Sequence, residues 1–462
     1  MLSKILPGWG IKRMDAIKLH KPVFLVVGLA GMFMAATAGA ADLVNVYQLA
    51  VDNYARLQAD EFEFKASSEA IIQARAGLLP EVGFEADYTE TEQKIVSSDT
   101  TVFATGDTKF PSDSYNLTVN IPIFRYDAWK RYSQSKAVVK QAHAELLASQ
   151  QQLMFDTAEA YFKVLGARDT LAYAQSEMTA VGRQLELAQE RVKRGLATVT
   201  DLRDAQARYA TAESKVVEAE SDLEDAYRGL SEFTGEFITE LNKLQASIPL
   251  EGPNPSALDE WIGTAMAQNY SLEASRQAVE VASDEARMQR AGHYPTLDFV
   301  GRLNNRDTNG SLFGGGSEVR TTDYMLRLNV PLYQGGSTSS KIREAGFNHQ
   351  KSRRELEADR RSLERETRMS YQGVLSGIKK VEALKKSVEF QESALEVKEE
   401  GLKAGINTML GVLDAQRDLY FSRRDYSQAR YDYLLSVLRL KKASGSLSPE
   451  DLQLLNGLLV EG

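Results

Sequence analysis

Four stretches of the chain alternate apolar and polar residues, a period of two that is typical of β-strands with two unlike faces. They are residues 84–89, 115–121, 297–304 and 324–330. A transmembrane β-barrel has this pattern, because its outer face meets lipid and its inner face meets water. An ordinary half-buried antiparallel sheet alternates identically, so the pattern alone leaves both structures open.

Two long proline-free spans, residues 123–248 and 332–448, have a different pattern. They are rich in Ala, Leu, Glu, Gln, Arg and Lys, with apolar residues three and four positions apart, which predicts helices. Apolar residues also recur at sevens, as in packed coiled coils: Tyr132, Val139, Leu146 and Leu153, then Val374, Val381, Val388 and Leu395. A helix over residues 126–194 would be roughly 100 Å long at about 1.5 Å per residue. We therefore expect an elongated protein.

The chain repeats itself. Residues 75–80 return as 290–295, residues 117–124 as 326–333, and residues 195–206 as 405–416. Three blocks in the same order indicate an internal duplication. Each half is expected to run helix, strand, loop, strand, long helix, tight turn, helix. We predict a first structural repeat over residues 41–250 and a second over residues 251–462.

The predicted strands are too few to close a barrel in one chain. Each chain offers four, and open sheet edges cannot be left in lipid. Eight strands from two chains or twelve from three would close, and a lumen that continues into a helical tube favours twelve. Residues 92–112 and 305–320 are long and polar, as expected of extracellular barrel loops. The glycine run at 314–316 follows no βα signature and is interpreted as a loop tip, not a phosphate site.

The N-terminal segment has the order of a secretory signal peptide. Basic residues come first, then the apolar run 23–34, then Ala38-Gly39-Ala40. We predict that residues 1–40 are removed on export, with Met14 as an alternative start.

Composition narrows the function classes. The chain has 462 residues, 43% of them hydrophobic, and no later stretch approaches the roughly 20 apolar residues of a spanning helix. It has no cysteine, which excludes disulfides, thiolate metal sites and a cysteine nucleophile. No nucleophile motif, metal-ligand spacing or nucleotide loop is present, so we expect neither an enzyme nor a cofactor or metal. A net charge of -9 without a basic block argues against nucleic acid.

Several ordered segments carry a resemblance to a known family. They are residues 78–80, 121–124 and 330–336 beside the strands, and the turn regions 194–202 and 404–415. On these segments the sequence resembles the TolC family of outer-membrane efflux and type I secretion channels, over about residues 41–455. It is closer to the family's founding member than to the lipidated members, because it has no cysteine to acylate.

The resemblance implies a homotrimer. Its twelve-stranded β-barrel, four strands from each chain, would lie in outer-membrane lipid and continue as a twelve-helix periplasmic α-barrel. The family's channels are passive and dock to a periplasmic membrane-fusion adaptor and an inner-membrane pump of the RND, ABC or MFS type. The cargo is not identified by the sequence.

An exported periplasmic coiled-coil protein, structural or adaptor-like, is the alternative. Such an adaptor would place one helical hairpin between the halves of a lipoyl-like domain. The duplicated order of strand pair and hairpin does not fit that arrangement.

The resemblance also implies a pore constriction. Asp414 matches one of two aspartates that ring the periplasmic end, and Gly411 stands where the other is expected. Asp204 occupies the equivalent place in the first half and is a second candidate. Clustered carboxylates would concentrate cations there.

Further residues match family positions at the closed tip. Thr200 and Asp201 match the acceptors of a closing link, whose expected arginine and tyrosine donors are replaced by Asn407 and Leu402. Closure must therefore depend on other contacts. Positions near the coiled-coil seams are matched by Gln184, Glu399 and Arg430, and adaptor-facing turn positions by Gly195, Leu196, Thr198, Gly405 and Thr408.

Overall fold

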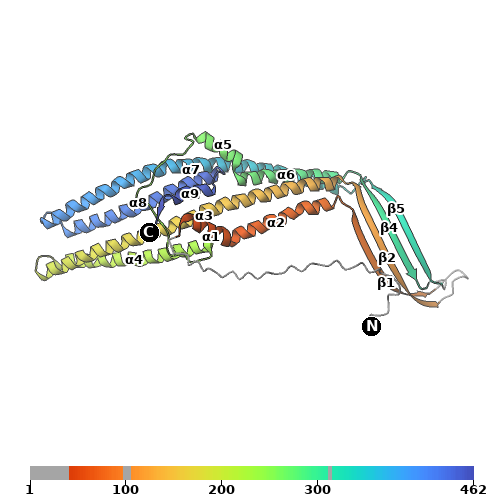
Figure 1. Cartoon of the computed structure of the whole chain (residues 1–462), viewed down its shortest axis with the longest axis horizontal. Coiled ribbons are helices and arrows are strands. Elements are labelled where there is room, and N and C mark those ends of the chain that lie inside the picture. Colours follow the sequence, from red (N-terminus) through yellow and green to blue (C-terminus); the bar gives the residue numbers. More distant parts are fainter. Residues whose placement is uncertain (1–40, 97–105, 311–314, 462) are drawn as a thin grey trace, which may run out of the picture. The chain divides into compact units, whose positions relative to one another are not determined.

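The computed structural model describes residues 41–96, 106–310 and 315–461 (Figure 1). The predicted signal peptide, residues 1–40, lies outside the described residues, as do parts of both predicted extracellular loops. No helix within the described ranges is long and apolar enough to cross a membrane.

The elements follow each other in two similar series. The first contains α1 (Leu43–Asn53), α2 (Ala55–Ala76), β1 (Glu81–Ile95), β2 (Gly106–Phe124), α3 (Tyr126–Lys193) and α4 (Val199–Thr234). The second contains α5 (Leu258–Gln268), α6 (Tyr270–Ala291), β4 (Thr296–Thr308), β5 (Ser317–Asn329), α7 (Ser337–Lys403) and α8 (Met409–Ala443). Short β3 (Lys243–Leu244) pairs with β6 (Leu459–Val460), which follows α9 (Pro449–Asn456).

The long helices form two antiparallel hairpins, α3 with α4 and α7 with α8 (Figure 1). Helix α3 spans 68 residues and matches the predicted range 126–194 to within one residue. The prediction that helix continues to residue 248 is wrong, because α4 ends at Thr234. Gly235 follows in the left-handed conformation with φ 71°, which terminates the helix.

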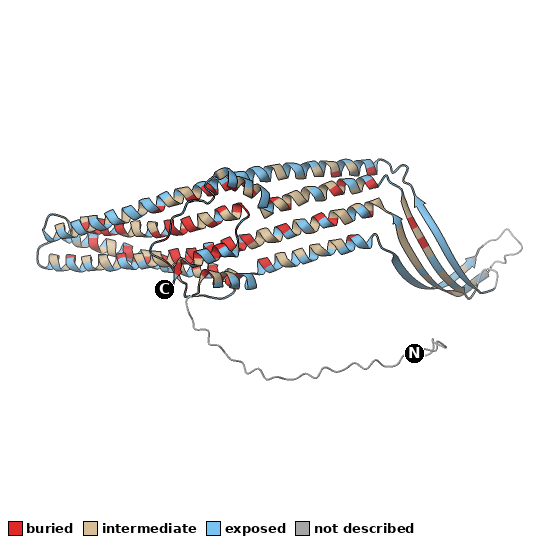
Figure 2. Ribbon diagram, turned by 45° about the horizontal axis from the view of Figure 1, so that its top comes forward, coloured by how far each residue is buried: buried red, intermediate tan, exposed pale blue. Residues whose placement is uncertain are grey.

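The four long strands form one antiparallel sheet in the order β1-β2-β4-β5. Its register aligns the predicted apolar positions: Phe84 pairs with Leu117, and Leu117 pairs with Leu303. Phe299 likewise pairs with both Ile121 and Leu326. Directly paired residues point to the same side of a sheet. The alternation predicted separately for each strand therefore builds one continuous apolar face, much of it exposed in the isolated chain (Figure 2).

The strands are longer than the sequence pattern predicted. Residues 92–95 and 106–112 belong to β1 and β2, and residues 305–308 and 317–320 belong to β4 and β5. These residues lack apolar alternation but pair along their backbones, and the β1–β2 pair adds charge pairs across it. The ammonium of Lys109 lies 3.3 Å from the carboxylate of Glu90, the residue directly after the predicted strand 84–89. The predicted loops 92–112 and 305–320 are correspondingly too long.

The main hydrophobic core lies midway along the long helices, where α1, α9 and the linker around β3 pack on α3 and α8 (Figure 2). Tyr161 and Phe162 of α3 are almost fully buried there, as is Leu438 of α8. At the helix–strand junction, Arg125 donates two hydrogen bonds of 2.9 Å to the carboxylate of Asp298. This pair ties the start of α3 to β4 of the second half.

Candidate functional site

The two hairpin turns have the same backbone geometry. Gly195 and Gly405 adopt φ 74° and 73°, the left-handed conformation that ends a helix and favours glycine. In each turn a threonine then caps the next helix: Thr198 accepts a hydrogen bond from the N–H of Asp201, and Thr408 accepts one from the N–H of Gly411. The repeated sequence blocks thus encode one turn that is used twice.

The turns differ at the third residue after the cap. The side chain of Asp201 accepts hydrogen bonds from the N–H of Thr198 at 2.9 Å and from its hydroxyl at 2.8 Å, completing a capping box. The backbone hydrogen bond from Thr198 lowers the pKa of Asp201. Gly411 stands at this place in the second turn and has no side chain to do the same. Asp201 is thus held within its own turn, and neighbouring Thr200 is exposed.

Asp414 lies in the second turn of α8 and faces α4. Its carboxylate is 2.9 Å from the guanidinium of Arg208 in α4 and 3.7 Å from that of Arg417 in its own helix. Asp204, the other predicted constriction residue, is exposed on α4 one helical turn before Arg208. Within the chain, the structure therefore brings Asp414 together with two arginines and not with Asp204.

Arg208 is a residue that sequence reasoning missed. At the offset of 210 that relates Gly195 to Gly405, Arg208 corresponds to Asp418. A cation in one half thus replaces a carboxylate in the other. This charge difference between the repeats was the available signal, but the sequence could not show which helices meet.

The three predicted seam residues lie in different surroundings. Glu399 of α7 accepts a hydrogen bond of 3.4 Å from Gln416 of α8. The side-chain oxygen of Gln184 is buried without a hydrogen bond among the described residues. Arg430 is 8% exposed and donates to the carbonyls of Gln245 and Ala246 in the linker after β3. The structure does not bring Arg430 together with the tip residues, since it fastens α8 to that linker.

Tyrosines join the two hairpins along α3 and α8. Tyr431 donates to Asp169 at 2.9 Å, and Tyr420 donates to the carbonyl of Ser176 at 3.3 Å. Between them, Tyr173 and Ser427 share a hydrogen bond of 3.0 Å. Burial, and then the nearby charge of Asp169, raise the pKa of Tyr431. The phenol therefore stays protonated and remains a donor.

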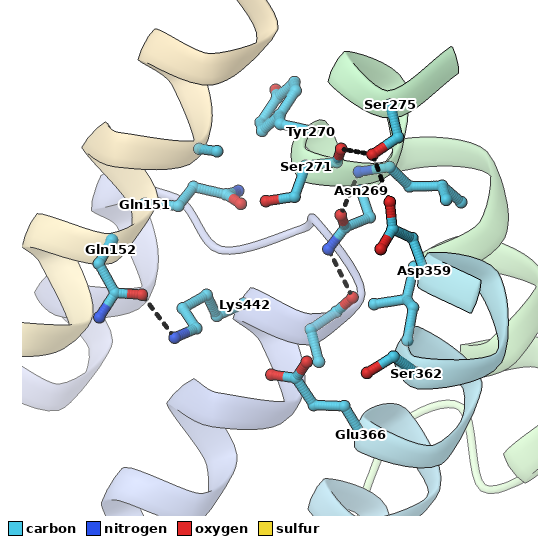
Figure 3. Close-up of a pocket in the computed structure, with 14 residues that line it drawn as sticks. Gln151, Gln152, Asn269, Tyr270, Ser271, Ser275, Asp359, Ser362, Glu366 and Lys442 are labelled. Atoms are coloured by element: carbon cyan, nitrogen blue, oxygen red, sulfur yellow. Dashed lines mark hydrogen bonds between the residues drawn. The ribbon is translucent and has the colours of Figure 1, made fainter. Parts of the chain in front are cut away.

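A polar cavity of about 430 Å³ lies where α6 begins beside α3, α7 and α8 (Figure 3). Its side chains already connect helices: Lys442 donates to Gln152 at 2.8 Å, and Ser275 donates to Asp359 at 2.7 Å. None of the predicted site residues lines it. Nor do the described residues contain a group of His, Asp or Glu side chains able to hold a metal ion. The hairpin tips remain the candidate functional site.

Paired helical hairpins of this length, joined to an antiparallel sheet with one apolar face, give the chain the fold of solved outer-membrane channels. The chain belongs to the outer membrane efflux protein family, whose family model matches residues 46–236 and 261–446. The resemblance stated from the turn and strand motifs is thereby confirmed.

Two relatives are similar in sequence to this chain over nearly its full length. Outer membrane protein TolC of Vibrio cholerae serotype O1 is 31% identical, over 94% of this chain and 97% of the relative. Proteases secretion protein PrtF of Dickeya chrysanthemi is 30% identical, over 94% of each chain. The fold is similar to the crystal structure of the CmeC outer membrane channel of Campylobacter jejuni, with a TM-score of 0.79, 14% identity, and coverage of 97% of this chain and 98% of that one.

Membership of this family assigns the chain to the outer membrane, with a large periplasmic portion, as a channel of efflux or type I secretion. The family is a family of transport conduits and not of enzymes. The alternative of a periplasmic coiled-coil protein that never enters a membrane is not supported by these matches.

Proposed function

We propose that three copies of this chain form a passive exit duct, in which a twelve-stranded β-barrel in outer-membrane lipid continues as a twelve-helix periplasmic tube. The observation that carries this proposal is the open four-stranded sheet. Strands β1 and β5 are its edges, and its apolar face includes Phe84 at 69% and Tyr324 at 79% exposure. Open edges and unpaired backbone groups are too costly in lipid.

Strand directions support closure between copies. The four strands alternate in direction, so β5 of one copy would run antiparallel to β1 of the next. This strand pairing would allow any whole number of copies to close a barrel, and the family resemblance selects three. In this proposal, residues 1–40 are a removed signal peptide, and residues 41–250 and 251–462 are two repeats that each supply one strand pair and one hairpin.

The hairpin turns are proposed to dock a periplasmic membrane-fusion adaptor, itself bound to an RND, ABC or MFS pump. The docking residues would be Gly195, Leu196, Thr198, Gly405 and Thr408. Leu196 is 68% exposed at one tip, and Ile406 is 82% exposed at the other. Exposed apolar side chains at both tips favour a protein partner there. Cargo would be of the efflux kind, as the description of the family says, or of the secretion kind, as the name of PrtF says of that relative.

The test of this function is planar-bilayer conductance of the detergent-extracted protein, with its mass in detergent measured on the same sample. We expect discrete channels from a species of three chains. A protein that washes off membranes without detergent and gives no channels would overturn the proposal. A conducting species of two or four chains would refute the trimer and keep the channel.

Within this duct we propose that Asp414 lines the periplasmic constriction, with Asp204 as a second contributor. Gln184 and Glu399 are proposed to stabilise the closed tip directly. Thr200 and Asp201, in the capped turn, and Arg430, which holds α8 to the linker, are proposed to support it indirectly, by fixing the helices that form the tip. Asp414→Asn removes one carboxylate per chain while keeping its shape. A neutral amide attracts a trivalent cation less than a carboxylate does. We expect block to require about tenfold more cation, which corresponds to about 1.4 kcal/mol of lost attraction.

The matched control for Asp414→Asn is Asp425→Asn. Asp425 is exposed on the same helix, α8, about three helical turns after Asp414. Trimers should form in both variants, and only Asp414→Asn should alter the block. Unchanged block in Asp414→Asn channels would show that this residue does not line the constriction.

A further inference from the structure

The four-stranded sheet has a polar face opposite its apolar one. Side chains alternate between the two faces of a strand, so the residues between the apolar positions share this face. The register aligns Asp87 of β1, Ser114 of β2 and Arg306 of β4 in one row across it. The hydroxyl of Ser114 donates to the carboxylate of Asp87 at 3.2 Å, so both side chains lie on the same side. In the proposed barrel this face lines the lumen.

Charge on the polar face is sorted by strand. It is acidic on β1 and basic on β4, and both sets of side chains are exposed. The acidic stripe consists of Glu81, Glu85 and Asp87, and the basic stripe consists of Arg302 and Arg306. Between the two stripes, β2 contributes only uncharged residues to this face, namely Ser114, Asn116, Thr118 and Asn120.

The other charges of this face largely offset one another. Asp298, at the periplasmic end of β4, accepts two hydrogen bonds from Arg125. Strand β5 carries one charge of each sign on this face, Asp323 and Arg327, and therefore forms no stripe. The acidic and basic stripes are thus the main separated charges of the sheet.

We propose that closure of the barrel gives its lumen stripes of alternating charge, which favour the passage of solutes with separated charges of both signs, such as zwitterionic peptides. This inference rests on the proposed trimer and names a class of cargo for it. Strands β1 and β4 are the first and third of the four strands in each copy. Around twelve strands, the stripes therefore alternate in sign at every second strand. The strand six places away lies across the lumen, so each acidic stripe faces a basic stripe of another copy.

The spacing of the stripes sets the size of solute that they fit. Neighbouring strands lie about 4.8 Å apart, so an acidic stripe and the next basic stripe are about 10 Å apart along the wall. An extended tripeptide also spans about 10 Å between its charged ends. Its ammonium can therefore lie at an acidic stripe while its carboxylate lies at a basic one. A simple anion or cation is attracted by one stripe and repelled by the next, so it gains less.

The experiment uses the absence of cysteine from the chain, because a single introduced thiol then reports on one place. Asn304→Cys lies in the basic stripe and Gly83→Cys in the acidic stripe. A Cβ at Gly83 would meet no atom within 4 Å, so the substitution fits. Asn116→Cys, on β2 between the stripes, is the matched control. The detergent-extracted trimer is treated with an anionic or a cationic methanethiosulfonate reagent, and mass spectrometry follows the reaction.

The measured quantity is the ratio of the anionic to the cationic reaction rate, in which any effect on the reactivity of the thiol itself cancels. Relative to Asn116→Cys, we expect this ratio to be about tenfold higher in Asn304→Cys and about tenfold lower in Gly83→Cys, since two like charges lie roughly 7 Å away along each strand. Adding Arg302→Gln and Arg306→Gln to Asn304→Cys should bring its ratio to that of the control. Equal ratios at the three sites, or no effect of replacing the arginines, would overturn the alternating charge.

Protection by triglycine tests the class of cargo. Triglycine should slow the reactions of Asn304→Cys and Gly83→Cys about threefold more than glucose, an uncharged solute of similar size, at equal concentration. With both arginines replaced, the two solutes should protect equally. Equal protection while the arginines are present would overturn the preference for zwitterions. Each variant is first checked for its mass in detergent. A wild-type protein that gives no channels in planar bilayers would instead overturn the proposed function.

Discussion

Leu303→Arg is expected to abolish assembly of the protein in the outer membrane. Leu303 lies near the centre of β4, on the apolar face, opposite Leu117. If this face meets lipid, an arginine there costs about 2–4 kcal/mol near the middle of the bilayer. In the proposed trimer three copies carry the substitution, so the cost per trimer is roughly 6–12 kcal/mol by the same figure. The measurement is the amount of heat-resistant oligomer in outer-membrane fractions.

The neighbouring substitution Asn304→Arg is the matched control. Asn304 lies on the opposite face of the same strand, and so does Arg302, an arginine that this face already accommodates. We expect Asn304→Arg to assemble normally and to change only the ion selectivity. Equal assembly of both variants would show that the apolar face is not in lipid, and failure of both would show that β4 tolerates no change of size.

The strands and long helices could be predicted because their signals are local. A period of two identifies the strands, and the absence of proline with apolar residues at sevens identifies α3 to within one residue. The outer thirds of the strands could not be predicted in this way. Their polar residues, such as Lys94 and Asp107, are placed by backbone pairing and charge across strands, and no periodicity reveals either.

The tip site could be predicted only in part. The glycine and threonine of each turn were visible because they repeat, and their conformations follow from left-handed geometry and capping. Asp414 was visible through the family resemblance. Its partner Arg208 was not, since it lies 206 residues away and contacts Asp414 only after the two hairpins pack. Arg430 was also visible through the family resemblance, but its sequence position did not indicate that it would donate to backbone carbonyls of the linker.

Tyr431→Ala is expected to destabilise the helical part more than any tip substitution. Tyr431 is 3% exposed, stacks on Phe162 of α3 with ring centres 5.7 Å apart, and donates to Asp169. Removing the ring leaves a cavity between the first and second halves of the chain. Losses of about 3–5 kcal/mol are typical of such aromatic truncations. The change is measured in detergent as the shift in the guanidinium chloride concentration at which half of the helical circular-dichroism signal is lost.

Tyr431→Phe separates the ring from the hydroxyl. It keeps the stack on Phe162 and removes only the hydrogen bond to Asp169, so the expected loss is about 1 kcal/mol. If the two variants had equal midpoints, the hydroxyl and not the packing would hold α3 to α8. A large gap between them would instead show that the halves are joined mainly by burial. In that case the ion pair between Arg208 and Asp414 near the tips can be removed while the core stays packed, because burial at the junction of the hairpins does not depend on it.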